Sequence, residues 1–325
     1  MQEHLNDTEK PSGLKIVFFG TPQFAAYILE YLVAHGENIV CVVTTSEKEQ
    51  GRGLKTRPAV LQEKAIELGI PFLAPKKVRD PEFIEQLRTF GADCFCVVAY
   101  KILPKEIYAM PKLGTFNVHT SLLPKYRGAA PMHRAIINGE RETGITTFLL
   151  DEQIDTGGIL LQEKIPITEN ETVGELHDEL MHLGAKLALQ TLRGLSNGSL
   201  HPQLQNTADA TPAPKIFPED CTIDFNRPAE QVHNHIRGLS PSPGAAMIAP
   251  SGERMKIYRT AIEHSEWKLP PSKFGSSTDK RKLYVGTATT PIEILELQRE
   301  GKKKMSAEEF LRGAQIPITN KPEQC

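Results

Sequence analysis

Short apolar runs alternate with amphipathic segments along the first two-thirds of the chain. Strands are predicted over residues 14–19, 38–44, 71–74, 92–100, 114–120, 143–150 and 159–167. Helices are predicted over residues 23–34, 59–68, 80–90, 103–110, 132–138 and 172–193. The run 92–100 is apolar throughout, which is typical of a strand buried on both faces of a parallel sheet. Strands that alternate with helices predict an α/β domain with a Rossmann-like, mostly parallel sheet.

The hydrophobic periodicity stops over residues 196–214, which are rich in Ser, Asn, Thr, Ala and Pro. Beyond this stretch we predict one helix over 228–237 and short strands over 222–225, 245–248, 255–261, 282–286 and 292–298. Several short strands separated by turns favour a small β-barrel. We therefore predict a Rossmann-like domain over residues 13–204, a linker over 205–214 and a smaller barrel domain over 215–325.

The composition is that of an ordinary globular protein, with 39% hydrophobic and 24% charged residues and a formal net charge of −2. No apolar run approaches the roughly 20 residues that span a bilayer. The polar N-terminus does not resemble a signal or transit peptide. We therefore expect a cytoplasmic protein with no membrane partner. The five cysteines form no C-x-x-C pair, which favours reduced structural thiols over a metal site.

Charge is distributed unevenly along the chain. From Ala213 onward there are 17 basic and 14 acidic residues, whereas the preceding part has 21 basic and 26 acidic residues. The second part is therefore mildly basic, which permits a polyanionic partner.

Two polar residues lie at the end of the predicted strand 114–120. Side chains alternate along a strand, so Asn117 and His119 share one face. Pro124 and Gly128 then prevent regular structure. Ligands of open α/β sheets bind at the carboxyl ends of strands, where a histidine can exchange protons and an amide can donate to an oxyanion. The pattern predicts a reaction site, although a purely structural role for both residues stays open.

The turn-rich loop 151–158 offers a carboxylate that could hold the imidazole in one tautomer. Asp155 is favoured because two glycines follow it and allow a close backbone turn. On spacing alone Asp151 and Glu152 compete for this role, and Asp155 could be a turn former. Asn, His and Asp without a Ser or Cys nucleophile favour direct acyl transfer.

Two further loops bear on ligand binding. The turn after the first strand has only Gly20 and lacks G-x-G-x-x-G, so we expect no nucleotide cofactor. The polar loop 46–58 carries Arg52 and Lys55, whose charges could meet phosphates. A solvated loop explains the same residues equally well.

The stretch FNVHTSLLPKYRGAAP over residues 116–131 closely resembles the signature of the 10-formyltetrahydrofolate-dependent formyltransferases. Ile154-Asp-Thr-Gly157 matches their second element. The segment 19–24, the Gly51-Arg-Gly53 loop and the tail 297–310 resemble the members that act on methionyl-tRNA. The resemblance extends from about residue 15 to residue 312.

This resemblance implies transfer of a formyl group from the cosubstrate 10-formyltetrahydrofolate to the α-amino group of methionine on initiator methionyl-tRNA, for translation initiation. It implies no metal and no nucleotide cofactor, and we expect a monomer. Asn117 would stabilise the tetrahedral oxyanion, His119 would polarise and transfer protons, and Asp155 would orient His119. A nucleotide-sugar formyltransferase, which would share the three residues but use a sugar amine, is the alternative.

The resemblance also implies two sets of binding residues. The folate contacts would come from Ser121, Leu122, Leu123 and Pro124. The second domain would be an OB-like, tRNA-binding barrel, and the tRNA contacts would come from Arg52, Lys55, Lys302, Lys303 and Lys304. Lys101 stands where many members carry glycine, at the strand end near the folate pocket.

Overall fold

A computed structural model of the protein describes residues 10–45, 48–50, 55–263, 267–313 and 317–321. Contacts divide the chain into two compact units. The first unit comprises Met1–Arg127, Gly144–Lys164 and Glu179–Pro212. The second unit comprises Gly128–Thr143, Ile165–Asp178 and Ala213–Cys325. The domain boundaries proposed from the sequence, 13–204, 205–214 and 215–325, stay a prediction.

The first unit is built on a seven-stranded sheet with the order β10-β9-β7-β6-β1-β2-β5. Its strands are β1 (Lys15–Gly20), β2 (Asn38–Val43), β5 (Phe72–Leu73), β6 (Cys94–Val98), β7 (Thr115–His119), β9 (Glu142–Leu149) and β10 (Ile159–Pro166). The pairs β1–β2, β1–β6, β2–β5 and β6–β7 are parallel, whereas β7–β9 is antiparallel. Every residue of β6 is buried, as its apolar sequence predicts. The α/β class with a mostly parallel sheet is confirmed.

The helices between the first strand and residue 196 are α1 (Gln23–Ala34), α2 (Val60–Glu67), α3 (Pro81–Thr89), α4 (Lys105–Tyr108), α5 (Pro131–Ile137) and α6 (Val173–Ser196). Side chains cap the starts of α3 and α6. Asp80 caps α3 by accepting from the Glu82 N–H. The Glu175 carboxylate accepts from the Thr172 N–H, and the Glu175 N–H donates back to the Thr172 hydroxyl, so a capping box begins α6.

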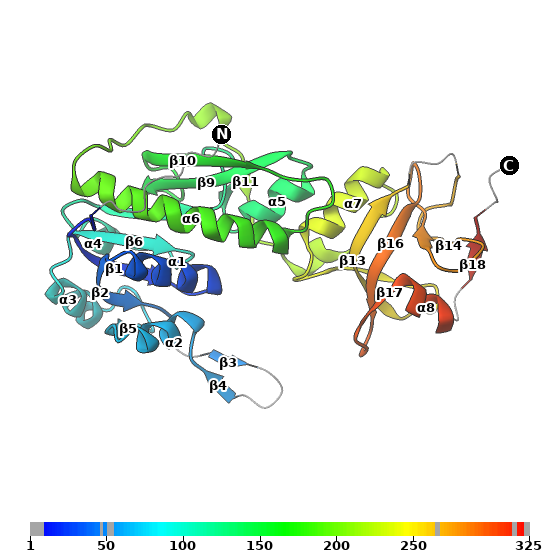
Figure 1. Ribbon diagram of the computed structural model, residues 1–325, viewed down its shortest axis with the longest axis horizontal. Helices are drawn as coiled ribbons and strands as arrows, with labels where there is room; N and C mark the ends of the chain where they lie inside the picture. The colour runs from blue at the N-terminus through cyan, green and yellow to red at the C-terminus, as the bar shows by residue number, and fades with distance from the viewer. Residues whose placement is uncertain (1–9, 46–47, 51–54, 264–266, 314–316, 322–325) are drawn as a thin grey trace. The chain divides into compact units, whose positions relative to one another are not determined.

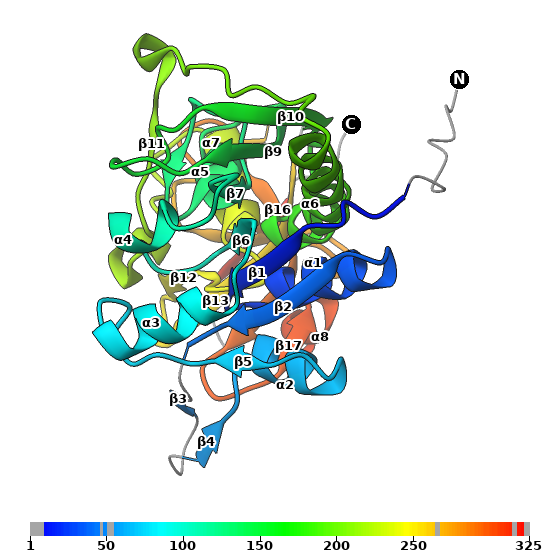
Figure 2. The same cartoon turned by 90° about the vertical axis from the view of Figure 1, so that its left-hand side faces the viewer.

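Helices cover both faces of this sheet (Figure 2). On one face, Phe83 of α3 and Ile107 of α4 belong to a buried cluster with Phe19 of β1 and Phe95 of β6. On the other face lie α1 and α6. The first unit therefore has the three layers expected of a doubly wound α/β fold.

The predicted loop 46–58 contains two short strands, so the prediction of an irregular loop was wrong in this part. β3 (Lys48–Gln50) pairs antiparallel with β4 (Lys55–Arg57). The hairpin lies beyond β5 (Figures 1 and 2). The sequence gives no sign of these strands because both are short and polar, without apolar alternation.

The second unit has a separate sheet with the order β12-β13-β16-β15-β14-β18, and β17 pairs with β16. Its strands are β12 (Ala245–Ile248), β13 (Arg254–Ile262), β14 (Phe274–Ser276), β15 (Leu283–Val285), β16 (Ile292–Arg299), β17 (Lys304–Ser306) and β18 (Ile318–Asn320). The helices α7 (Ala229–Gly238) and α8 (Ala307–Gly313) accompany this sheet. Ile236 of α7, Ile257 of β13 and Phe310 of α8 share one core.

Two predictions for the second unit were wrong. Residues 222–225 form no strand but a single bridge between Thr222 and Ala246, because the 3-10 turn η2 (Pro218–Cys221) comes directly before them and Asp224 accepts from the Asn226 N–H in a turn. Residues 263–280, where no strand is predicted, include β14, whose Phe274 is buried. Three residues are too few to show a period of two.

The stretch predicted as a linker contains the 3-10 turn η1 (Thr207–Asp209) and β11 (Pro212–Ala213), which pairs with β8 (Arg127–Gly128). In the described part of the chain no helix is long and apolar enough to cross a membrane.

Four cysteines are free and buried: Cys41, Cys94, Cys96 and Cys221. Burial raises the pKa of the Cys41 and Cys94 thiols to about 12, so both stay protonated at neutral pH. The prediction of reduced structural thiols is confirmed for these four, and Cys325 lies outside the described residues.

Candidate active site

β7 places Asn117 and His119 beside two neighbouring strands. β7 runs parallel to β6 and antiparallel to β9, with His119 opposite Thr146 in the register. His119 is buried and Asn117 is half-buried. The polar pair predicted from strand alternation is therefore held inside the first unit.

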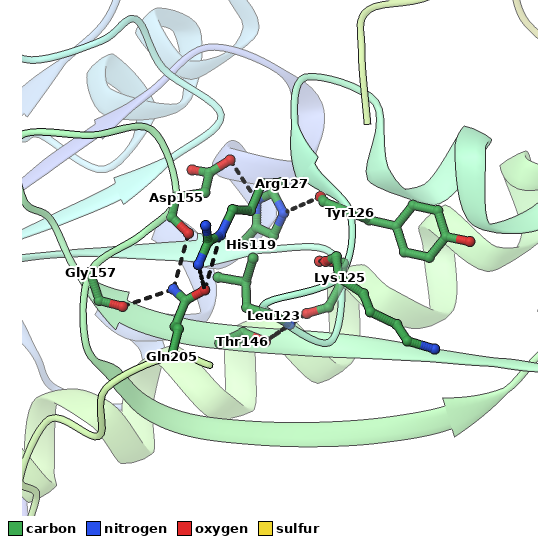
Figure 3. A network of polar contacts seen from close by, with 10 residues as sticks. His119, Leu123, Lys125, Tyr126, Arg127, Thr146, Asp155, Gly157 and Gln205 are labelled. Carbon is green, nitrogen blue, oxygen red and sulfur yellow. Dashed lines mark hydrogen bonds and ion pairs between the residues drawn. The ribbon is translucent and has the colours of Figure 1, made fainter. Parts of the chain in front are cut away.

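The His119 ring is fixed by a backbone carbonyl (Figure 3). Its Nε2 lies 3.0 Å from the Tyr126 carbonyl oxygen. A carbonyl oxygen only accepts, so Nε2 carries the proton and donates it to this bond. The other ring nitrogen, Nδ1, lies 3.9 Å from the Asp155 Oδ2. This distance is too long for a hydrogen bond, although it brings a carboxylate within ion-pair range of the imidazole.

The loop between β9 and β10 is closed by a glycine. A Cβ on Gly157 would lie 1.7 Å from the Leu149 carbonyl oxygen, so no other residue fits there. This close approach folds the loop back and leaves Asp155 at a φ of +56°. The Asp155 side chain is only 11% exposed and faces His119.

The two competing carboxylates are engaged elsewhere. Asp151 accepts from the Gln153 N–H and the Thr156 hydroxyl within its own loop. The exposed Glu152 pairs with Lys105 at 2.8 Å, and this contact lowers the Glu152 pKa and raises the Lys105 pKa. Of the three acids in this loop, the structure brings Asp155 to the imidazole.

Asn117 has unused hydrogen-bonding capacity. Among the described residues, its Oδ1 is one of six buried side-chain polar atoms without a hydrogen-bond partner. A buried polar atom without a partner costs about 1–3 kcal/mol, so such atoms are few in folded proteins, and a catalytic role is one explanation for them. The amide can accept from an attacking amine and donate to a developing oxyanion.

Backbone strain collects near this strand end. Five described residues other than glycine have a positive φ, and three of them, Ala99, Tyr126 and Asp155, lie in the first unit. Ala99 follows β6, Tyr126 supplies the carbonyl that fixes His119, and Asp155 faces the same ring. Strained residues of this kind cluster at functional sites.

The loop after β7 is tied to β9 and β10. The Leu123 N–H donates to the Thr146 hydroxyl at 3.1 Å, and that hydroxyl donates to the Ser121 carbonyl at 2.6 Å. The Gln162 amide donates to the Leu123 carbonyl at 2.9 Å. Thr146 and Gln162 were missed from the sequence, because threonine and an isolated glutamine are ordinary strand residues.

The four residues matched to folate contacts differ in exposure. Ser121 is fully buried and its hydroxyl donates to the Lys125 carbonyl at 2.7 Å. Leu123 is buried, whereas Leu122 and Pro124 are partly exposed. Only the last two offer side-chain surface to a ligand before any rearrangement. The exposed Lys101 follows β6.

Comparison with known proteins identifies the family. The profile of the formyl transferase family matches residues 14–192, and that of the formyl transferase C-terminal domain matches residues 215–315. The methionyl-tRNA formyltransferase of Bacteroides thetaiotaomicron is 42% identical over 94% of this chain and 98% of its own. The methionyl-tRNA formyltransferase of Porphyromonas gingivalis is 44% identical over 94% of this chain and 97% of its own. The chain belongs to the methionyl-tRNA formyltransferase family.

Solved structures agree with this family at the level of fold. HypX from Aquifex aeolicus in complex with tetrahydrofolic acid has a TM-score of 0.64 at 17% identity, covering 96% of this chain. The match covers 50% of the HypX chain. The N-formyltransferase from Helicobacter canadensis, in complex with folinic acid and dTDP-3-aminofucose, has a TM-score of 0.64 at 21% identity. This match covers 99% of the Helicobacter canadensis chain and 88% of the present chain.

The residues predicted to contact tRNA lie far apart in the sequence and differ in their local contacts. Arg52 lies outside the described residues, and Lys55 begins β4. Lys302 and Lys303 are exposed in the second unit. The Lys304 Nζ lies 3.9 Å from the centre of the Tyr258 ring and 3.7 Å from the Glu296 Oε2, so local contacts within the second unit already hold this charge.

Proposed function

We propose that the protein transfers the formyl group of 10-formyltetrahydrofolate to the α-amino group of initiator methionyl-tRNA, with tetrahydrofolate as the other product. The observation that carries the proposal is the set at the end of β7, where Asn117, whose Oδ1 has no hydrogen-bond partner, accompanies His119 and Asp155. Full-length similarity to methionyl-tRNA formyltransferases supports this choice of acceptor. Formylated methionyl-tRNA serves translation initiation, so we also propose a cytoplasmic enzyme, acting as a monomer.

The chemistry is a direct acyl transfer. The amine nitrogen attacks the formyl carbon, the carbonyl oxygen becomes an oxyanion, and the bond from this carbon to N10 of the folate then breaks. Asn117 can assist the attack and the formation of the oxyanion, because its Oδ1 can accept from the amine and its NH₂ group can donate to the oxyanion. The site needs no covalent intermediate with the protein.

Protons move in the same step. The amine loses one proton and N10 of the folate gains one. We assign this transfer to the Nδ1 of His119, because Nε2 is held by the Tyr126 carbonyl. Asp155, at 3.9 Å from Nδ1, would stabilise the imidazolium that forms. By this proposal the contact would shorten on substrate binding, as catalytic contacts commonly do.

The substrate-binding residues form two sets, one for the folate and one for the tRNA. Leu122 and Pro124 would offer apolar surface to the folate beside Asn117, with Ser121 and Leu123 supporting their loop. Arg52, Lys55, Lys302 and Lys303 would contact tRNA phosphates, and Lys304 would contribute least because Tyr258 and Glu296 already engage it.

One assay tests the function. Purified protein, 10-formyltetrahydrofolate and initiator methionyl-tRNA should give formylmethionyl-tRNA and tetrahydrofolate. The same mixture with a dTDP-linked amino sugar in place of the tRNA should give no product. Turnover of the amino sugar but not of the tRNA would overturn the proposal in favour of a nucleotide-sugar formyltransferase.

A further inference from the structure

Gln205 lies in the stretch predicted as a linker, yet its side chain is fully used inside the first unit (Figure 3). Its Nε2 donates to the Asp155 carbonyl at 3.0 Å and to the Gly157 carbonyl at 2.8 Å. Its Oε1 accepts from the Arg127 Nε at 3.1 Å and from the Arg127 Nη2 at 2.7 Å. One amide therefore connects Arg127 to the backbone on both sides of Thr156.

We propose that Gln205, oriented by Arg127, is a positioning residue that keeps the Asp155 carboxylate directed at His119 during formyl transfer. The inference rests on the proposed function, since it assigns a role within that reaction. Gln205 acts through the backbone of the Asp155 loop and touches neither the imidazole nor, by this proposal, the substrates.

The Asp155 loop needs such support. Asp155 has a φ of +56°, a conformation that residues other than glycine adopt reluctantly. Its neighbour Ile154 is 58% exposed, so this apolar side chain is not anchored in a core. Hydrogen bonds to the carbonyls of Asp155 and Gly157 fix the peptide orientations on either side of the turn. The direction of the Asp155 side chain follows from them.

The same short segment fixes both members of the His–Asp pair. The Tyr126 carbonyl holds the His119 ring, and the next residue, Arg127, holds Gln205. The backbone at this point is itself secured by Thr211, whose hydroxyl accepts from the Tyr126 N–H and whose carbonyl accepts from the Arg127 N–H, both at 2.9 Å. The backbone at Tyr126 and Arg127 therefore helps to position both His119 and Asp155.

The chemistry requires glutamine rather than glutamate. A carboxylate at position 205 would keep the pair with Arg127 but would turn lone pairs toward two carbonyl oxygens. The substitution Gln205→Glu therefore removes the N–H donor to the Asp155 loop and keeps a side chain of nearly the same shape. Gln205→Leu removes both this donor and the oxygen that accepts from Arg127.

The first test separates turnover from binding. In formylation of methionyl-tRNA, Gln205→Glu and Gln205→Leu should each lower kcat about 10- to 100-fold, the range expected when a reacting group is misplaced by about 1 Å. KM for both substrates should change little. Gln203→Leu, which replaces an exposed glutamine of the same segment, is the matched control and should keep kcat. Unchanged kcat in Gln205→Glu would overturn the proposal.

The second test asks whether the effect passes through Asp155. If it does, Gln205→Leu should cost little further in an Asp155→Asn background, because the group it positions is already lost. A full, multiplicative loss in the double variant would show a general structural role and would overturn the proposal. Failure of the proposed function looks different, because wild-type protein would then make no formylmethionyl-tRNA at all.

Discussion

Each unit of the protein buries a histidine beside an asparagine, and the two arrangements differ in how much hydrogen-bonding capacity they leave unused. His233 in the second unit binds the Thr260 hydroxyl through Nδ1 at 2.8 Å and the Glu169 carbonyl through Nε2 at 3.1 Å. Burial lowers the pKa of His233, so it is a neutral residue with both nitrogens engaged. His119 has one nitrogen engaged and the other facing Asp155 at 3.9 Å.

The asparagines show the same contrast. The Asn234 Oδ1 accepts from the Arg237 Nε at 2.8 Å, and Arg237 also donates to the Thr168 and Glu171 carbonyls. The Asn117 Oδ1 has no hydrogen-bond partner. A cavity of about 490 Å³ lies beside His233, Asn234 and Arg237, yet the contacts of these residues are internal to the second unit. Burial of polar groups, even next to a cavity, does not by itself mark a reaction site. At the end of β7, unused hydrogen-bonding capacity occurs together with backbone strain.

The largest expected effect is on Asn117. Asn117→Ala should lower kcat about 10²- to 10³-fold, because one donor to the oxyanion is removed from a buried site. Steady-state formylation kinetics measure it. Asn170→Ala, at an exposed position, is the control and should leave kcat unchanged. Near-normal turnover of folded Asn117→Ala would remove this residue from the catalytic set.

The two histidines should differ in their effect on turnover. His119→Ala should lower kcat at least about 10²-fold, the low end for a lost acid–base group, and should also lower the melting temperature, because the Tyr126 carbonyl loses a buried donor. His233→Ala should keep kcat and lower the melting temperature, because the Thr260 hydroxyl and the Glu169 carbonyl lose a buried partner. Equal losses of kcat in both variants would contradict the distinction between a catalytic and a structural histidine.

Arg237 should matter for stability alone. Arg237→Met leaves three acceptors without their donor and should lower the free energy of unfolding by about 1–3 kcal/mol. Urea denaturation measures this change, with the exposed Arg254→Met as the matched control. An unchanged denaturation midpoint would show that these hydrogen bonds add no net stability.

Stability should fall as the pH is lowered. Burial is the main cause that lowers the pKa of His133, His233 and His235 below 6.5 in the folded protein. Between the folded and unfolded pKa values the unfolded chain binds more protons, so the free energy of unfolding decreases as the pH falls through about 6.5. Melting temperatures from pH 7.5 down to pH 5.5 test this.

A neutral replacement provides the control for the pH effect. His233→Gln should flatten the decline of melting temperature with pH, whereas the exposed His201→Gln should keep it. Parallel declines in all three proteins would show that buried histidines are not its source.

The smallest expected effect concerns the lysines near β17. If Lys303 contacts a tRNA phosphate, Lys303→Ala should reduce the slope of log affinity against log salt by about one. Lys304→Ala should change this slope less, because Lys304 already contacts Tyr258 and Glu296. Filter binding of methionyl-tRNA at several salt concentrations measures both. A larger change for Lys304 would reverse the assignment.

The sequence by itself determined much of the first unit. The helical pattern of apolar residues predicted α1 with its observed bounds, and strand alternation placed Asn117 and His119 on one face. These features are local, because period, caps and turn residues act over a few positions. The choice of Asp155 as the carboxylate depended on the two glycines after it and on the family resemblance.

Only the tertiary structure decided which distant groups meet. Closure of the Asp155 loop depends on the contact of Gly157 with the Leu149 carbonyl, which no pattern reports. Gln205 reaches carbonyls 48 and 50 positions away and an arginine 78 positions away, from a stretch without hydrophobic period. Sequence periodicity records which face a side chain takes. It does not record which polar atoms remain without a partner after packing, and the Asn117 Oδ1 is such an atom, whereas the Asn234 Oδ1 accepts from Arg237.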